Sequence, residues 1–353
     1  MHIPDGYLSP STSVVLTGMM LPIWNRAARK VSARFDVGRV PLIAIGAAFS
    51  FVIMMINIPV PDGTTAHAVG GTLLAITLGP WAATLALSVA TLIQALFFGD
   101  GGILAYGANA LNMAVILPFA GYYIFRLIRG RSAPGSWRYY AAASVGAYVG
   151  IVLAGLATGF ELGIQPALFH TAAGVPLYSP YGLKVALGAM AIAHFLVAGP
   201  VEAAVTGLAL AYIFRTQPNM LAGEPGVAEA TTTGAAAMDG RARPAYRALL
   251  VPLGILVVLT PIGLLAKGTA WGEWGLGELG DRLGYAPSGL VRLSAWWHSL
   301  LPDYTLGALE ATGSKSGAIL GYLVSGLVGL AVIGIIAGGL IIAGRRRTHA
   351  GPS

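Results

Sequence analysis

The first two residues of the chain, Met1 and His2, carry three nitrogen atoms that could chelate one metal ion. A free terminal amine, the deprotonated His2 backbone nitrogen and the ring Nδ1 would close a five-membered and then a six-membered chelate ring. Three corners of a square plane are then filled. The following Pro4-Asp5-Gly6 favours a turn that aims this end back toward the rest of the chain. A histidine at position 2 also occurs by chance, so this pattern alone does not establish a metal site.

A second Pro-Asp-Gly turn, at residues 61–63, precedes His67, which could supply the fourth nitrogen. The other ring nitrogen of such a ligand needs a hydrogen-bond acceptor. A square-planar field of four nitrogens favours Ni(II) or Cu(II), and Co(II) is weaker in the affinity order. The alternative is that His67 simply caps the start of a helix.

Four further polar residues lie inside apolar stretches. Asn109 and Asn112, three residues apart, could orient metal ligands or join two helices by hydrogen bonds. His194 and Glu202 lie eight residues apart, on roughly one face of a helix. Ionisable residues at such positions are functional candidates, although the pattern favours a helix-to-helix hydrogen bond for this pair.

The composition predicts an all-α membrane protein. Of 353 residues, 56% are hydrophobic, only 10% are charged, and none is cysteine, while soluble chains carry about 25% charged residues. A soluble enzyme is therefore excluded, as are disulfides and thiolate metal sites. The net charge of +7 does not indicate nucleic acid, because the basic residues lie between long apolar runs that face lipid.

Runs of about 20 apolar residues mark predicted membrane spans. We expect a body of about seven transmembrane helices and a C-terminal module of two. The third run is short, and Gly79-Pro80 separates it from the fourth by a tight turn. The nine predicted spans are 10–27, 41–58, 67–78, 80–98, 103–127, 139–160, 183–213, 248–267 and 317–344.

Basic residues concentrate in alternate loops, and the loops between them hold most of the acids. Because cytoplasmic loops are enriched in Lys and Arg, we expect the N-terminus outside and the C-terminus in the cytoplasm. Met1 to Gly6, the loop 57–66 and the loop 99–102 then share the outer face. The first residues lack the basic and apolar regions of a signal peptide, so we expect Met1 to remain the first residue.

The chain divides into three predicted parts: a metal-binding transmembrane domain (1–215), a cytoplasmic linker (216–245) and a two-span module with an outer loop (246–353). The linker is rich in Gly, Ala and Thr and lacks periodicity. Four tryptophans in the outer loop suit a membrane interface better than a buried pocket, namely Trp271, Trp274, Trp296 and Trp297.

Three segments of the first 215 residues resemble the CbiM/NikM family, the cobalt- and nickel-specific substrate-binding subunits of energy-coupling factor (ECF) transporters. The segments begin at MHIPDGYLSP, PVPDGTTAHAVGG and HFLVAGPVEAAVTG. The resemblance implies that the terminal amine of Met1, the backbone and ring nitrogens of His2, and His67 hold the metal. It also implies a compact helical bundle in the cell membrane, a transmembrane coupling (T) protein and cytoplasmic ATPase (A) subunits as partners.

The resemblance extends to the C-terminal module, which looks like a NikN or PDGLE-type component fused to the main subunit, although the PDGLE pentapeptide is absent. It leaves open whether the module stabilises the loaded state, aids metal entry or assists assembly. Contact with the coupling protein is expected through the small pair Ala44 and Ala48, or that pair packs within the bundle. No phosphate-loop order occurs, so ATP hydrolysis is assigned to partner subunits and the chain is not an enzyme.

The sequence therefore predicts a membrane subunit that imports Ni(II) and needs no cofactor of its own. One alternative is a Co(II) importer subunit that serves cobalamin synthesis. Another is an accessory or scaffold membrane protein that does not transport. A third, a vitamin-binding subunit of the same transporter class, predicts an organic ligand and no dependence on His2.

Overall fold

The computed structural model describes residues 1–34, 40–61, 64–217, 247–266, 268–310 and 313–349. Within these residues the regular elements are helices and one short antiparallel hairpin, β1 (Ile58–Val60) with β2 (Thr64–Ala66). The predicted all-α membrane fold is confirmed. The predicted linker falls almost wholly outside the described residues, as do Asp62 and Gly63 of the second Pro-Asp-Gly turn.

The first 217 residues form ten helices, some extended by π-helical turns. They are α1 (Pro10–Arg34), α2 (Val40–Met54), α3 (Gly71–Leu78), α4 (Pro80–Ile93, continued to Phe98), α5 (Tyr106–Ala110, continued to Ile116), α6 (Leu117–Arg129), α7 (Trp137–Gly163), α8 (Gln165–Leu168), α9 (Leu183–Ala193, continued to Ala198) and α10 (Gly199–Thr216).

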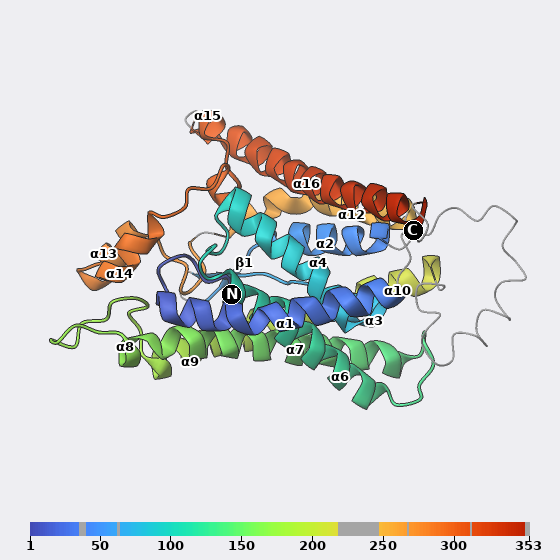
Figure 1. Cartoon of the computed structure of the whole chain (residues 1–353), viewed down its shortest axis with the longest axis horizontal. Helices are drawn as coiled ribbons and strands as arrows, with labels where there is room; N and C mark the ends of the chain where they lie inside the picture. The colour runs from blue at the N-terminus through green and yellow to red at the C-terminus, as the bar shows by residue number, and fades with distance from the viewer. Residues whose placement is uncertain (35–39, 62–63, 218–246, 267, 311–312, 350–353) are drawn as a thin grey trace, which may run out of the picture.

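The C-terminal module has two long helices joined by an outer loop with short helical turns. Its elements are α12 (Arg247–Leu259, continued as a 3₁₀ helix to Leu265), α13 (Leu276–Leu283), α14 (Ser288–Ser294), a 3₁₀ turn (Pro302–Tyr304), α15 (Gly307–Glu310) and α16 (Lys315–His349). Figure 1 shows α16 and α12 running along α2, with α13 and α14 beyond one end of the bundle.

The number of full membrane crossings is smaller than predicted. Six helical stretches of the described chain are long and apolar enough to span a membrane, and α2 has 15 residues. The predicted span at 67–78 contains only α3, whose eight residues cover about 12 Å at 1.5 Å per residue. Residues 67–70 before it are not helical. The prediction of nine comparable spans was therefore wrong at this position.

Glycines allow the body helices to approach closely. A Cβ atom added at Gly146 of α7 would lie 2.5 Å from the carbonyl oxygen of Gly121 in α6, and one added at Gly150 would lie 2.6 Å from that of Leu117. Backbones in such contact pack through van der Waals attraction, which replaces the hydrophobic effect inside a membrane. These contacts explain part of the high glycine content of the chain.

The C-terminal module packs on α2. A Cβ atom at Gly329 of α16 would lie 2.2 Å from the Phe51 ring, and the Tyr322 hydroxyl donates to the carbonyl of Met55 at 3.1 Å. Ala48 of α2 is only 5% exposed within this arrangement, and Ala44 is half buried. A contact of this pair with a coupling protein stays a prediction.

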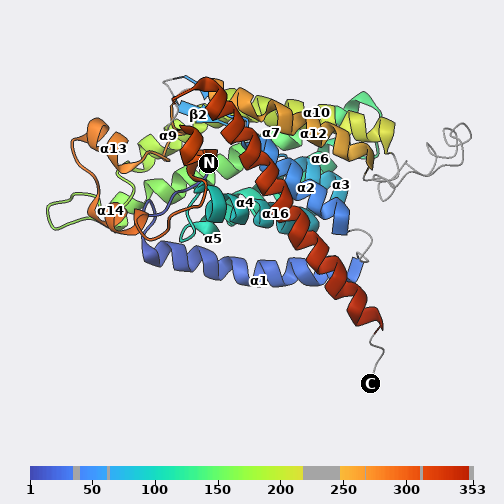
Figure 2. The same cartoon turned by 90° about the horizontal axis from the view of Figure 1, so that it is seen from above.

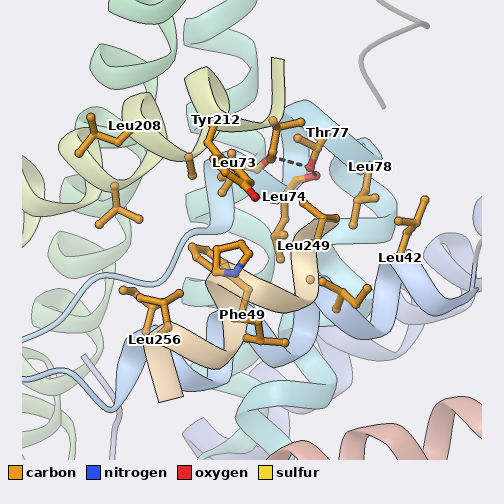
Figure 3. Close-up of a pocket in the computed structure, with 18 of the residues that line it drawn as sticks. Leu42, Phe49, Leu73, Leu74, Thr77, Leu78, Leu208, Tyr212, Leu249 and Leu256 are labelled. Carbon is orange, nitrogen blue, oxygen red and sulfur yellow. Dashed lines mark hydrogen bonds between the residues drawn. The ribbon is translucent and has the colours of Figure 1, made fainter. Parts of the chain in front are cut away.

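The other helix of the module, α12, leaves an apolar cavity of about 400 Å³ against α2, α3 and α10. Figure 3 shows its walls, to which Phe49, Leu73, Tyr212 and Leu256 contribute. Because the walls are almost entirely hydrocarbon, this cavity does not suit a metal ion.

Candidate metal centre

The amino end of the chain is folded into the interior rather than left on the surface. Met1, His2 and Ile3 are 6%, 2% and 0% exposed. Figures 1 and 2 place the N-terminus among the helices, beside the ribbon of the outer loop. The three nitrogen donors predicted at Met1 and His2 are thus removed from bulk water.

Asn109 fixes the backbone just after His2. Its Oδ1 accepts from the Ile3 nitrogen at 2.8 Å, and its Nδ2 donates to the Ile3 carbonyl at 3.1 Å. The Gly102 nitrogen donates to the same carbonyl at 2.8 Å. The peptide groups of Ile3 are therefore satisfied although they are buried, and the residue before them has a defined position.

The predicted Pro4-Asp5-Gly6 turn is present. The Tyr7 nitrogen donates to the Pro4 carbonyl at 3.4 Å, and Gly6 has a φ of +91°. The Asp5 carboxylate accepts from the nitrogens of Ile103 and Leu104 at 3.2 and 2.8 Å. Burial raises the pKa of Asp5, and these backbone donors partly oppose that shift. The turn therefore ties the amino end to the loop after α4.

His67 follows the β1–β2 hairpin and lies against His2, with ring centroids 5.1 Å apart. Its Nδ1 lies 3.1 Å from the Ala68 carbonyl, which can only accept, so the proton is on Nδ1 and Nε2 keeps a lone pair. Burial, and then the charges of the terminal amine and of His2, lower the pKa of His67 well below its usual value. His67 is consequently a neutral ring whose buried Nε2 has no hydrogen-bond partner.

Glu202 holds the segment behind His67. Its Oε2 accepts from the nitrogens of Val69 and Gly70 at 2.7 and 2.9 Å, and its side chain is fully buried. The sequence analysis favoured a hydrogen bond between helices for this residue. The contact assigns Glu202 of α10 to the support of the His67 segment.

His194 lines a small cavity together with Met1 and His67. Its Nδ1 lies 2.7 Å from the Met190 carbonyl of its own helix, which places the proton on that nitrogen. The proximity of His194 to His67 was not expected from the sequence, because 127 residues separate the two positions.

Asp100 approaches the His2 ring, and sequence reasoning did not select it. One carboxylate oxygen lies 2.8 Å from His2 Nδ1, but not along the line of a hydrogen bond, so both ring nitrogens of His2 lack a hydrogen-bond partner. The other oxygen accepts from Gln94 and from the hydroxyl of Tyr304. Burial alone would raise the pKa of Asp100, but the charges of His2 and His67 and the hydrogen bond from Tyr304 together outweigh burial and lower the pKa. A carboxylate therefore faces the ring that is predicted to bind the metal.

The outer loop of the C-terminal module completes the enclosure. Glu273 lies 3.2 Å from the terminal nitrogen of Met1, and Ala270 and Trp271 line the cavity beside His67. Trp274 is 4% exposed, with its ring beneath Arg282. The prediction that these tryptophans suit a membrane interface rather than a buried pocket was wrong for Trp271 and Trp274.

Two tryptophans of the same loop are exposed, Trp296 by 59% and Trp297 by 41%.

Asn112 makes its hydrogen bonds away from Met1 and His2, donating to Thr158 and Glu161 at 3.1 and 2.7 Å. Its predicted influence on the metal ligands stays a prediction.

The predicted donor set includes the terminal amine and a backbone nitrogen. No group of three His, Cys, Asp or Glu side chains suited to a metal ion occurs in the part of the chain that the structure describes. The structure does bring together the terminal amine and His2 with His67, which are 65 residues apart in sequence. Such a nitrogen-rich set suits Ni(II) or Cu(II) better than a hard cation that prefers oxygen.

Comparison with known families divides the chain into two parts. A family model described as the cobalt uptake substrate-specific transmembrane region matches residues 2–220, and a PDGLE domain model matches residues 247–346.

Individual relatives cover nearly the whole chain. The fused nickel transport protein NikMN of Rhodobacter capsulatus is 44% identical over 98% of both chains. The probable fused nickel transport protein LarMN of Lactiplantibacillus plantarum is 44% identical over 96% of this chain and 97% of its own. A crystal structure of a truncated transition metal transporter matches with 57% identity and a TM-score of 0.58, over 61% of this chain and 99% of that one.

Proposed function

Because this chain belongs to the family of cobalt uptake substrate-specific transmembrane proteins and carries a PDGLE domain, we propose that it captures Ni(II) for import across the cell membrane. The family resemblance noted in the sequence is confirmed by these matches to both parts of the chain. The relatives that match over almost the full length carry names of nickel transport. The solved structure that matches 61% of the chain is named as a transition metal transporter.

The observation that carries this proposal is that Met1 and His67 line one small cavity and that the His2 ring stacks on the His67 ring, with centroids 5.1 Å apart. The terminal amine, the His2 backbone nitrogen, His2 Nδ1 and His67 Nε2 supply four nitrogens. His67 keeps a free lone pair, and its Nδ1–H already has the acceptor that a metal-bound histidine needs. This donor set matches the square-planar preference of Ni(II).

Co(II) is the second candidate, because the matching family model is described as cobalt uptake. Two observations favour nickel. The two fused relatives, which share both parts of this chain, are named as nickel transport proteins. A field of four nitrogens with a deprotonated amide also binds Ni(II) more tightly than Co(II) in the general affinity order.

Transport requires partners in this proposal, namely a coupling protein and cytoplasmic ATPase subunits, since the sequence has no nucleotide-binding motif. The ion is released when His67 moves away from the nitrogens of Met1 and His2, because those three nitrogens alone bind the ion less tightly than four. Glu202 of α10 accepts hydrogen bonds from the backbone just after His67, so motion of α10 would move His67. The metal faces the outside and the basic helix ends face the cytoplasm, as the positive-inside rule requires.

The test is a Ni(II) titration of the purified full chain, with Met1 verified as the first residue by intact mass. A matched variant carries two leucines inserted between Met1 and His2, which keeps both histidines but moves the terminal amine two residues further from the His2 ring. We expect about one Ni(II) per wild-type chain and loss of tight binding in the insertion variant. Equal binding by both proteins, or by neither, would overturn the proposal and favour the vitamin-binding or scaffold alternatives.

A further inference from the structure

Glu273 of the C-terminal module approaches the amino end of the chain. Its carboxylate lies 3.2 Å from the Met1 nitrogen, and the two groups are 17% and 1% exposed. The residues are 272 positions apart, and they belong to different parts of the family match. An ion pair this well shielded from water is stronger than one on an open surface.

Neighbouring contacts fix the backbone on both sides of Glu273. Thr64 donates to the Thr269 carbonyl at 3.1 Å, and the Tyr7 hydroxyl donates to the Trp274 carbonyl at 2.7 Å. The carboxylate is therefore brought to the amine by a loop that is anchored to the body before and after it.

The module also contacts a residue beside the His2 ring. The Tyr304 hydroxyl donates to Asp100, whose second oxygen lies beside His2 Nδ1. Burial, followed by the charge of Asp100, raises the pKa of Tyr304 well above its usual value, so the phenol remains a donor. Gln94 of the body supports both groups, since it donates to Asp100 at 3.2 Å and to Tyr304 at 2.9 Å.

We propose that Glu273 is a positioning residue of the metal site, which holds the terminal amine at the corner of the chelate that it must occupy. This inference rests on the proposed function. In the metal-free protein the carboxylate pairs with the ammonium group. When Ni(II) binds, the metal replaces one proton of that nitrogen and the proton passes to water. The coordinated amine retains two N–H groups, one of which still donates to Glu273.

The assignment gives the C-terminal module a defined part in metal capture. The body supplies all four nitrogen ligands, and the module supplies the carboxylate that orients the most mobile of them. A terminal residue is held by the chain on one side only. The conformational entropy lost when it becomes ordered therefore weakens metal binding, unless another group already holds the residue in place.

The experiment compares four full-length proteins: wild type, Glu273→Ala, Glu273→Gln and Asp281→Ala. Asp281 is an exposed acid of the same loop, so its variant reports the general effect of losing one negative charge. Ni(II) affinity is measured by calorimetry and the ligand set by the visible absorption of the bound ion. We expect Glu273→Ala to weaken binding about 10- to 100-fold, Glu273→Gln to weaken it less, and Asp281→Ala to change it under about threefold.

The absorption spectrum separates positioning from ligation. At saturating Ni(II), Glu273→Ala should show the wild-type spectrum, because the four nitrogens remain. A changed spectrum would overturn the proposal by making Glu273 itself a ligand, and an affinity equal to that of Asp281→Ala would overturn it by showing that only charge matters. Either result requires a wild type that binds Ni(II), so it is distinct from failure of the proposed function.

A double variant excludes a merely structural effect. When two leucines are inserted before His2, the amine no longer lies where Glu273 can hold it. The residual Ni(II) affinity of that variant should then be unchanged by Glu273→Ala, because coupled residues are not additive. A further loss of the same size in both backgrounds would contradict the assignment.

Discussion

Asn109 both donates to and accepts from Ile3, so a single side chain holds the residue after His2 in two directions. The amide comes from α5, more than 100 positions along the chain. The two hydrogen bonds resemble the pair that two opposite residues exchange in an antiparallel sheet, but here a side-chain amide replaces the second strand. They set the chain direction of the amino end.

Replacing Asn109 with alanine should weaken Ni(II) binding about 10- to 100-fold, since groups that orient metal ligands have effects of this size. The measurement is a calorimetric titration. Asn112→Ala is the matched control, because that amide bonds only to Thr158 and Glu161. We expect this control to lower stability and leave affinity within about threefold. Equal losses in both variants would restore the prediction that both asparagines act on the metal.

Gly6→Ala should lower the thermal unfolding midpoint by several degrees. Gly6 has a φ of +91°, and an added Cβ would lie 2.8 Å from the Leu290 carbonyl oxygen. Left-handed backbone costs a residue other than glycine about 1–2 kcal/mol, before any clash is counted. Gly18→Ala is the control, because no atom lies within 4 Å of its added Cβ. A midpoint for Gly6→Ala that matches this control would refute the close packing of the turn on α14.

Glu202 should tolerate glutamine far better than alanine. Both backbone donors reach one oxygen, Oε2, and the amide oxygen of glutamine can replace it. Glu202→Ala leaves the buried nitrogens of Val69 and Gly70 unpaired and lets the His67 segment move. We expect about tenfold or greater loss of Ni(II) affinity for alanine and less than about threefold for glutamine, from equilibrium titrations. Identical affinities for the two variants would show that Glu202 does not position His67.

Removal of metal should destabilise the protein measurably. A ligand at 100 times its dissociation constant stabilises the folded state by about 2.7 kcal/mol. We therefore expect Ni(II) to raise the unfolding midpoint of wild type and a chelator to reverse the increase. His67→Ala should show neither change, while His170→Ala, whose Nδ1 bonds only to the Pro166 carbonyl, should behave as wild type. A nickel-dependent shift that survives in His67→Ala would place the ion elsewhere.

The proposed metal ligands could be named from the sequence because their chemistry is local. Met1 and His2 are adjacent, and the turn residues around them and before His67 can be recognised without a structure. Glu273 and Asp100 could not be found in this way. Single acids among glycines have no spacing signal, and only the fold brings them to a residue as distant as Met1 or His2.

The helical class followed from composition, but the number of crossings did not. Hydropathy cannot distinguish a full span from α3, where four non-helical residues and eight helical ones share one apolar run. The buried positions of Trp271 and Trp274 were missed for a related reason. An aromatic ring suits an interface and a protein interior equally well, and the difference depends on Tyr7 and Tyr181 packing against them.

The pairing of Met1 with Glu273 also sets an order of assembly. A ribosome releases the first residue early and the carboxylate only 272 residues later. During that interval the terminal amine has no Glu273 to pair with, and contacts between such distant positions form slowly. The surroundings of the amino end are therefore completed late in synthesis, and a chain that stops before Glu273 lacks the carboxylate that lies beside its terminal amine.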